Sequence, residues 1–205
     1  MSQIALGRYG DRTLDDDTIK RIYKLRHEVF HGRLGWDIIS DHGMEHDFFD
    51  KLNPIYVLAR GDSNEIEACS RLLPTMGPYM LKDVFPQLLH GQLPPEHPDI
   101  WELSRFAVSK SKRDRAIPSF GLGETSIRML RSVVHFAIQN RIKRYVLVTT
   151  VAVERLLRKQ GFDIRRFGPP LCIGKTIAVA CWFEVGRHAE SAVSGQLPQV
   201  YRAAA

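Results

Sequence analysis

Residues 144–161, RYVLVTTVAVERLLRKQG, place a strand pattern directly before a helix pattern. The first half, Arg144 to Thr150, is rich in β-branched apolar residues, which is typical of a buried strand. The second half, from about Val153 to Gln160, has apolar residues at helical spacing, and Gly161 is the kind of residue that ends a helix. A strand followed at once by an amphipathic helix predicts an α/β fold.

The same alternation continues on both sides of this segment. Further strands are predicted at residues 54–60, 66–73, 101–108, 162–167 and 176–185, and further helices at 14–30, at 80–90 with a break at Pro86, and around 127–138. Residues 31–53 and 110–123 are predicted to form loops. This order of elements predicts a three-layer α-β-α sandwich with a mixed central sheet.

The chain has 205 residues, of which 44% are hydrophobic and 25% are charged. These are ordinary values for a globular protein, so disordered and fibrous classes are excluded. The length favours one domain, which we expect to span residues 1–190, with residues 191–205 as a flexible C-terminal tail.

Membrane and secretion signals are absent from the sequence pattern. No stretch approaches the roughly 18 to 20 apolar residues that span a bilayer. Met1 to Gly10 lack the apolar core of a secretory signal. The three cysteines, Cys69, Cys172 and Cys181, lack metal-ligand spacing and predict reduced thiols in a cytoplasmic protein.

Charge is divided unevenly along the chain. Residues 1–104 carry 11 Lys and Arg against 17 Asp and Glu, whereas residues 105–166 carry 15 against 4. The formal charges of these two parts are therefore −6 and +11. This asymmetry indicates two partners of opposite charge, unless it is an arbitrary division of solvated surface charge.

Arg26 lies on the apolar face of the first predicted helix, close to Tyr23 and Phe30. Burying an unpaired arginine is very costly, so this position predicts either a structural ion pair or a charged group held in a cleft. The carboxylates available to pair with it follow in the sequence: Asp41, Glu45, Asp47 and Asp50.

The segment WELSRF, residues 101–106, places two charges inside an apolar strand. Strict alternation puts Glu102 and Arg105 on opposite faces of a sheet. If both serve one site, a β-bulge must realign them, and bulges are frequent beside active sites. Charges in the middle of a strand favour a functional role over a purely structural pair.

Basic residues surround the predicted helix after Thr150. They are Arg141, Lys143, Arg144, Arg155, Arg158, Lys159, Arg165 and Arg166. Such a stripe is compatible with nucleic acid. However, neither a recognition-helix motif nor interleaved aromatic residues accompany it, and an acidic protein partner fits equally well. Gly121-Leu122-Gly123 before a helix is compatible with a phosphate site or with a flexible loop.

An ordered set of motifs makes this sequence resemble a known family. The motifs are LRHEVF (25–30), LGW (34–36), MEHDFFD (44–50), RLLPT (71–75), PYMLKDVF (78–85) and WELSRF (101–106). Together they resemble the acyl-homoserine-lactone synthases, the autoinducer synthases of bacterial quorum sensing, over about residues 5–185. The resemblance implies a fold like that of the GCN5-related N-acetyltransferases.

The resemblance also implies a reaction. An acyl group, usually from acyl-acyl carrier protein, is joined to the amine of S-adenosylmethionine, the methionine portion cyclises to a lactone, and methylthioadenosine leaves. S-adenosylmethionine is then a substrate, and no cofactor or metal is implied. The implied partners are the acidic carrier protein and S-adenosylmethionine, with no nucleic acid and no membrane insertion.

The residues implied to bind S-adenosylmethionine are Arg26, Phe30, Trp36, Asp47, Asp50, Arg71 and Phe106, and Phe85 is a structural signature. Phe30 and Trp36 are suited to stacking on the adenine or facing the sulfonium cation. Asp47 and Asp50 are suited either to holding cationic parts of the substrate or to ordering Arg26.

The implied catalytic residues are Glu102, Ser104 and Arg105. The nucleophile must be a neutral amine, so a base is required, and Glu102 is the candidate. Backbone N–H groups from Ser104 to Phe106 are candidates for stabilising the tetrahedral oxyanion. Either Arg71 or Arg105 is suited to binding the substrate carboxylate through two hydrogen bonds.

An apolar tunnel for the acyl chain is implied as well. Its candidate lining is Met80, Leu103, Leu130, Leu147, Val148, Thr149, Val153 and Leu157, each of which is also compatible with ordinary core packing. Family members that favour 3-oxo-acyl chains often carry a threonine at the position we align with Leu147. The leucine predicts an unsubstituted or 3-hydroxy chain.

The residues predicted to dock the carrier protein are Arg155, Arg158, Lys159 and Arg166. Two other functions compete with this interpretation. One is a conventional N-acetyltransferase that uses acyl-coenzyme A, although such an enzyme does not need the set of residues around Arg26. The other is a non-catalytic basic module that binds nucleic acid.

Overall fold

The computed structural model describes residues 3–12, 14–36, 38, 40–109 and 122–194. Residues 110–121 of the predicted loop and the tail from residue 195 onward lie outside the described residues. The chain divides into two compact units. Unit 1 comprises residues 1–71, 105–132 and 196–205, and unit 2 comprises residues 72–104 and 133–195.

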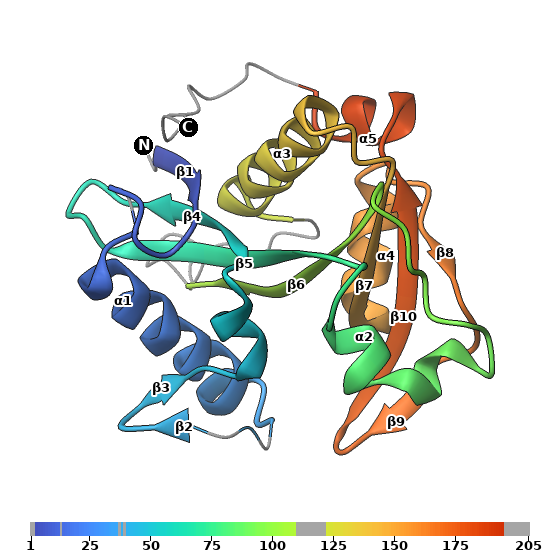
Figure 1. Cartoon of the computed structure of the whole chain (residues 1–205), viewed down its shortest axis with the longest axis horizontal. Helices are drawn as coiled ribbons and strands as arrows, with labels where there is room; N and C mark the ends of the chain where they lie inside the picture. The colour runs from blue at the N-terminus through green and yellow to red at the C-terminus, as the bar shows by residue number, and fades with distance from the viewer. Residues whose placement is uncertain (1–2, 13, 37, 39, 110–121, 195–205) are drawn as a thin grey trace. The chain divides into compact units, whose positions relative to one another are not determined.

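Unit 1 contains a short sheet and the first helix of the chain (Figure 1). Its elements are β1 (Gln3–Gly7), α1 (Asp16–His27), the π-helix η1 (Glu28–Arg33), β2 (Ser40–Asp41), β3 (Met44–Glu45), the 3-10 helix η2 (Phe48–Leu52) and β4 (Ile55–Arg60). Three more elements, β5 (Ile66–Pro74), β6 (Ile100–Val108) and α3 (Glu124–Gln139), run along the chain from one unit into the other. In unit 1 the strands follow the order β1-β4-β5-β6, and β2 and β3 form a separate pair.

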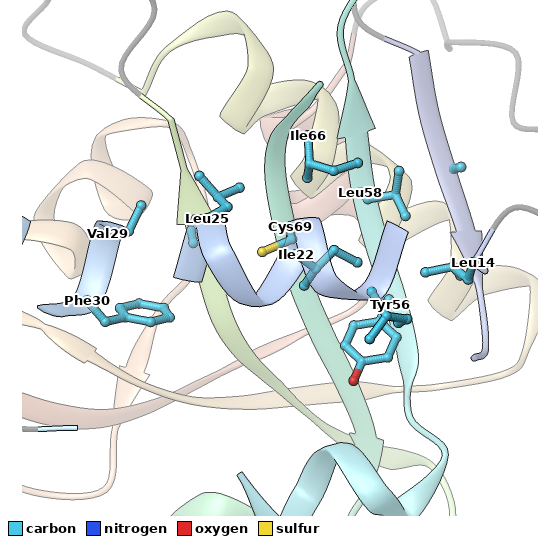
Figure 2. Close-up of a cluster of buried hydrophobic side chains, with 12 residues drawn as sticks. Leu14, Ile22, Leu25, Val29, Phe30, Tyr56, Leu58, Ile66 and Cys69 are labelled. Carbon is cyan, nitrogen blue, oxygen red and sulfur yellow. The ribbon is translucent and has the colours of Figure 1, made fainter. Parts of the chain in front are cut away.

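Helix α1 begins at Asp16, two residues after the start of the helix predicted at 14–30. Asp15 is the N-cap, and its side chain accepts a hydrogen bond from the backbone N–H of Thr18 at 2.9 Å. Figure 2 shows Ile22 and Leu25 of this helix among the buried side chains of β4 and β5, including Leu58 and Cys69. This packing holds one face of α1 against the sheet of unit 1.

The helix predicted to end at Phe30 instead changes geometry after His27. In the π-helix η1 the N–H of Leu34 donates to the carbonyl of Val29 at 3.0 Å, which is a five-residue step. Beyond it, the N–H of Trp36 donates to the carbonyl of Phe30 at 2.9 Å. Apolar spacing alone does not distinguish this wider turn from an α-helix, and such turns are frequent at functional sites.

Unit 2 contains the strand and helix of the segment at 144–161. Its elements are α2 (Met80–Asp83), the 3-10 helix η3 (Pro86–Leu89), β7 (Arg144–Thr150), α4 (Val151–Lys159), β8 (Arg165–Arg166), β9 (Leu171–Ile173), β10 (Thr176–Glu184) and α5 (Arg187–Ala192). The strand order is β5-β6-β7-β10-β8, and β9 also pairs with β10. The pairing of β6 with β7 is parallel, whereas β10 runs antiparallel to β7 from Ala178 opposite Thr150 to Glu184 opposite Arg144. The predicted α/β class with a mixed sheet is thus confirmed.

Side chains of β7 and β10 alternate between two faces of the sheet. Val146 and Val148 pack with Ala180 and Trp182 in a cluster that also contains the buried residues Tyr79, Leu81, Leu88 and Leu89. Leu147, between the two valines, points to the opposite face because successive strand residues alternate. This placement bears directly on the residues proposed for the acyl chain.

Several boundaries differ from those predicted. The strand expected at 162–167 is limited to the two residues of β8, and β1, β9 and α5 were not predicted. Helix α5 extends to Ala192, so the first two residues of the expected tail are helical. Within the described ranges, no helix is long and apolar enough to cross a membrane.

Candidate active site

Six charged side chains of unit 1 form one network. They are Arg26 of α1, Glu45 of β3, Asp47 and Asp50 at the start of η2, Arg71 of β5 and Arg105 of β6. Three positive and three negative groups balance each other, so the network is formally neutral. We call these six residues the charged cluster.

Arg26 is almost fully enclosed, with a side chain only 1% exposed. It donates Nε to Glu45 and Nη1 to Asp50 Oδ1, the latter at 2.8 Å. Burial disfavours its charge, but Asp50 and Glu45 more than offset this, so the pKa of Arg26 lies well above its ordinary value. The predicted pairing of Arg26 with the following carboxylates is confirmed for these two and for Asp47, whose Oδ2 lies 3.8 Å from Arg26 Nη2. Asp41 is exposed and lies 3.5 Å from His42 instead.

Arg71 has no exposed side-chain surface and binds Asp47 through two hydrogen bonds. Its Nη1 lies 2.5 Å from Asp47 Oδ1 and its Nη2 lies 3.0 Å from Asp47 Oδ2. The same Nη1 also donates to Asp50 Oδ1 at 2.8 Å. The guanidinium that the sequence suggested for a substrate carboxylate is therefore engaged by the protein's own carboxylates.

Asp50 is the point where these contacts converge. Its Oδ1 accepts hydrogen bonds from Arg26, Arg71 and the Tyr56 hydroxyl, and its Oδ2 accepts one from the backbone N–H of Asp47. Burial opposes the charge of Asp50, but Arg26 and Arg71 more than offset it and hold the pKa of Asp50 well below its ordinary value. Of the two roles suggested for this residue, ordering the arginines matches the geometry.

Arg105 occupies an irregular position in β6. Its φ of 52° is left-handed, which is unusual for any residue other than glycine and interrupts the regular alternation of the strand. Its Nη2 lies 2.9 Å from both Glu45 Oε1 and Asp47 Oδ2, while its Nε has no hydrogen-bond partner within the described part of the chain. Burial lowers the pKa of the Arg105 guanidinium. The β-bulge that would bring Glu102 and Arg105 to one site stays a prediction; the structure shows a left-handed backbone at Arg105 itself.

Two aromatic rings lie beside the charged cluster. Phe30 and Trp36 stack with ring centroids 5.2 Å apart and an angle of 9° between their planes. The Arg105 guanidinium lies over the Phe30 ring at 5.6 Å. The η1 turn creates this arrangement, since it brings the backbone of Trp36 onto that of Phe30. Phe106, which follows Arg105, is half-buried.

Glu102 belongs to unit 2 and is fully buried. Its two carboxylate oxygens accept the backbone N–H groups of Met80 at 3.1 Å and Leu81 at 2.8 Å, at the start of α2. Ser104 is half-buried two residues further along β6. Phe85 packs against the cluster that contains Val146.

The candidate acyl-chain residues do not all share one surface. Met80, Leu103, Leu130, Leu147 and Leu157 are buried, whereas Val148 and Thr149 are half-buried and Val153 is 39% exposed. Leu147 and Val148 are adjacent strand residues that point to opposite faces of β7, so they cannot both line one tunnel wall. Val148 shares its face with Val146 and Ala180.

The four candidate docking residues are exposed on α4 and β8. Two of them, Arg158 and Arg166, bind the buried carboxylate of Glu154. Glu154 and Tyr56 were not predicted from the sequence, and Glu45 was predicted only as a possible partner of Arg26. A signal for Glu154 was its spacing: it lies three residues before Leu157, on the buried side of α4, and four before Arg158. Among the described residues, no group of three or more His, Cys, Asp or Glu is placed to hold a metal ion.

Comparison with known proteins gives a consistent result. The autoinducer synthase family profile matches residues 11–193. The acyl-homoserine-lactone synthase of Pseudomonas aeruginosa is 40% identical over 183 residues, covering 88% of this chain and 89% of that protein. The acyl-homoserine-lactone synthase of Ralstonia solanacearum is 45% identical over 180 residues, covering 86% and 87%.

Solved structures agree in fold. The AHL synthase LasI superimposes with a TM-score of 0.85 at 38% identity and covers 98% of this chain and 99% of its own. TofI, solved in a ternary complex with an inhibitor and MTA, has a TM-score of 0.77 at 32% identity and covers 93% and 96%. A putative N-acetyltransferase from Lactobacillus plantarum, only 14% identical, has a TM-score of 0.57 and covers 89% and 99%, so the likeness extends to acetyltransferases in fold alone.

Proposed function

This chain belongs to the autoinducer synthase family and is an acyltransferase of the acyl-homoserine-lactone synthase type, and from this premise we propose how its residues divide the reaction. The amine of S-adenosylmethionine attacks the thioester carbonyl carbon of the acyl donor, the donor leaves as a free thiol, and an amide forms. A carboxylate oxygen of the methionine portion then displaces the sulfur. The lactone closes, and methylthioadenosine leaves with the electron pair of the broken C–S bond.

The observation that supports this division is the exposure pattern of the charged cluster. The side chains of Arg26, Arg71, Glu45 and Asp50 are at most 3% exposed, whereas Arg105 is 13% and Asp47 is 19% exposed. Only the last two present appreciable surface to a ligand. Asp47 is therefore suited to the ammonium group of S-adenosylmethionine and Arg105 to its carboxylate, because each has charge opposite to that group.

The stacked pair beside Arg105 is suited to the rest of this substrate. Trp36 is half-buried and offers a flat indole for the adenine ring. A sulfonium cation over an aromatic face is stabilised by about 0.5–2 kcal/mol. The four more deeply buried members of the charged cluster then act by holding Arg105 and Asp47 in place.

Glu102 remains our candidate for the general base. Two backbone N–H donors hold its carboxylate in a fixed position in β6. Positioned proton transfer typically contributes about 10²- to 10⁴-fold to a rate. Ser104 and the backbone that follows it are the candidates for oxyanion stabilisation.

We propose acyl-acyl carrier protein as the donor, because the exposed cations of α4 and β8 match an acidic protein. The alternative is a coenzyme A thioester, since the solved acyl-homoserine-lactone synthase BjaI is CoA-dependent. Leu147 has no hydroxyl for a 3-oxo group, which favours an unsubstituted or 3-hydroxy chain. The free thiols of Cys69, Cys172 and Cys181 fit a cytoplasmic location.

A single assay tests this function. The purified protein is incubated with S-adenosylmethionine and matched acyl donors, carrier-protein and coenzyme A thioesters of saturated, 3-hydroxy and 3-oxo chains. Methylthioadenosine and lactone are then measured by mass spectrometry. We expect equal amounts of both products, with carrier-protein donors preferred. Acyl transfer without methylthioadenosine release would point instead to a conventional N-acyltransferase, and mainly 3-oxo products would contradict the role of Leu147.

A further inference from the structure

Helix α4 buries a carboxylate where a surface helix ordinarily buries an apolar side chain. Two residues of this nine-residue helix are buried, Glu154 and Leu157, and the side chain of Glu154 is 1% exposed. Neither the charged cluster nor Glu102 belongs to this helix. The position therefore needs an explanation of its own.

Two arginines from different elements meet on this carboxylate. Arg158, one helical turn further along α4, donates Nε to Glu154 Oε1 at 3.0 Å. Arg166 of β8 donates Nε to Oε1 at 2.9 Å and Nη2 to Oε2 at 2.5 Å, so it binds both oxygens. Hydrogen bonds from Arg166 and then Arg158 lower the pKa of Glu154, which keeps it ionised at neutral pH.

Both arginines are partly exposed to solvent, and both are held in place by the buried carboxylate of Glu154. The Arg158 side chain is 46% exposed and the Arg166 side chain is 35% exposed. Arg158 contacts Glu154 through its Nε. Two long cationic side chains thus have defined positions on a surface where such side chains are usually mobile.

Stability alone does not account for a carboxylate here. A buried ion pair is often no more stabilising than a well-packed apolar side chain of similar volume, because both charges must lose their hydration. The effect specific to the carboxylate is that it fixes the positions of the two guanidinium groups relative to each other. Side chains fixed before binding lose less conformational entropy when a partner docks.

We propose that Glu154 is a positioning residue that pre-orders Arg158 and Arg166 for docking an acidic carrier protein. The inference rests on the proposed carrier-protein donor. Glu154 with its two arginines leaves a net charge of +1, and the neighbouring exposed residues Arg155 and Lys159 raise the charge of this surface to +3. That charge complements an acidic protein surface. The fixed positions of the two arginines favour one orientation of the docked carrier protein.

The test compares two substitutions that change the charge equally. Glu154→Gln and Glu184→Gln each remove the negative charge of a glutamate in unit 2 that pairs with arginine. Glu184 is the matched position because it pairs with Arg144 at 2.5 Å. If charge alone mattered, both would strengthen attraction to the acidic donor and lower its KM. If Glu154 positions the arginines, Glu154→Gln raises the KM for acyl-acyl carrier protein by about threefold to tenfold, whereas Glu184→Gln does not.

The other kinetic constants separate positioning from general damage. With Glu154→Gln we expect an unchanged KM for S-adenosylmethionine and an unchanged kcat at saturating carrier-protein donor. Arg166→Lys keeps the charge but loses the two-point contact, so we expect it to raise the same KM. It also provides the decisive measurement should Glu154→Gln fail to fold, as judged by circular dichroism.

Two outcomes would overturn the inference in distinguishable ways. If the wild-type protein used coenzyme A thioesters with the same efficiency as carrier-protein thioesters, the proposed donor would be rejected, and the role of Glu154 with it. A wild-type protein that depends on the carrier protein, with an unchanged KM in both Glu154→Gln and Arg166→Lys, would reject the role of Glu154 while leaving the proposed function intact.

Discussion

The Tyr56 hydroxyl donates a hydrogen bond to Asp50 Oδ1 at 2.8 Å, and this oxygen also accepts from Arg26 and Arg71. Three donors from α1, β4 and β5 therefore converge on one atom of η2. Burial and the charge of Asp50 raise the pKa of Tyr56, so the phenol remains a donor at any physiological pH. The position of Asp50 thus depends on a neutral group as well as on two cations.

Substituting Tyr56→Phe removes one of these donors and leaves the ring in place. We expect the free energy of unfolding to fall by about 1–2 kcal/mol, because a hydrogen bond to a charged group is lost in a buried setting. The KM for S-adenosylmethionine should rise a few-fold if Asp50 supports the binding residues. Urea denaturation and steady-state kinetics measure these effects, and an unchanged KM would show that Tyr56 acts on stability alone.

Asp50→Asn should be more damaging and should change the pH dependence of stability. The arginines lose a charged partner, for which we expect a cost of about 3 kcal/mol at neutral pH. The pKa of Asp50 is depressed in the folded state, so its contribution is full above the unfolded pKa of about 3.9 and is lost as pH falls towards the folded value.

The difference in unfolding free energy between wild type and Asp50→Asn should therefore shrink as the pH is lowered from about 5 to 3. Urea denaturation at several pH values measures it. A difference that stays constant over this range would contradict the assignment of a depressed pKa to Asp50.

The Phe30–Trp36 stack predicts an aromatic requirement in nucleoside binding. Trp36→Leu should weaken the binding of methylthioadenosine by about threefold to tenfold, because an aromatic stacking contact is lost. Trp36→Phe keeps a flat ring and should retain most of the affinity. Isothermal titration calorimetry measures both, and equal losses in the two variants would argue against stacking on the adenine.

Glu102→Gln tests the proposed base. We expect kcat to fall by about 10²-fold or more, with little change in the KM for S-adenosylmethionine. The amide also offers a single acceptor oxygen to the two N–H groups of Met80 and Leu81, so some stability should be lost.

Glu96→Gln is the matched control for this variant, because Glu96 is an exposed carboxylate of unit 2 that pairs with Lys82. It should leave both kcat and stability near the wild-type values. If Glu102→Gln lost stability but kept its kcat, Glu102 would be a cap of α2 and not the base.

Local chemistry explains which elements the sequence could predict. The start of α1 is indicated by the carboxylates of residues 15–17, which favour the N-terminal end of a helix, and the pairing of Arg26 follows from the cost of burying its charge. The π-helix could not be predicted in this way, because Val29 and Phe30 continue the helical apolar spacing across it. Strand β8 is only two residues long, too short for any periodicity to be visible.

The role of Asp50 was also beyond the sequence alone. The sequence allowed it either to hold the substrate or to order Arg26, and its contacts with Arg26, Arg71 and Tyr56 in the structure favour the second role. In the same way, Glu154 looks like an exposed helix charge until β8 brings Arg166 onto it. Both cases depend on contacts between residues of different helices and strands, which the spacing of residues along the chain does not reveal.

Strand β8 has a further consequence. It closes the strand order of unit 2, and its two residues face opposite sides: Arg166, opposite Cys181, reaches Glu154, while Arg165, opposite Trp182, lies over the indole at 5.2 Å. An edge strand has unpaired backbone N–H and C=O groups, which can pair with strands of other molecules. A short edge strand with a high positive charge disfavours such pairing. The same arginines should therefore protect the protein against self-association and fibril growth during synthesis.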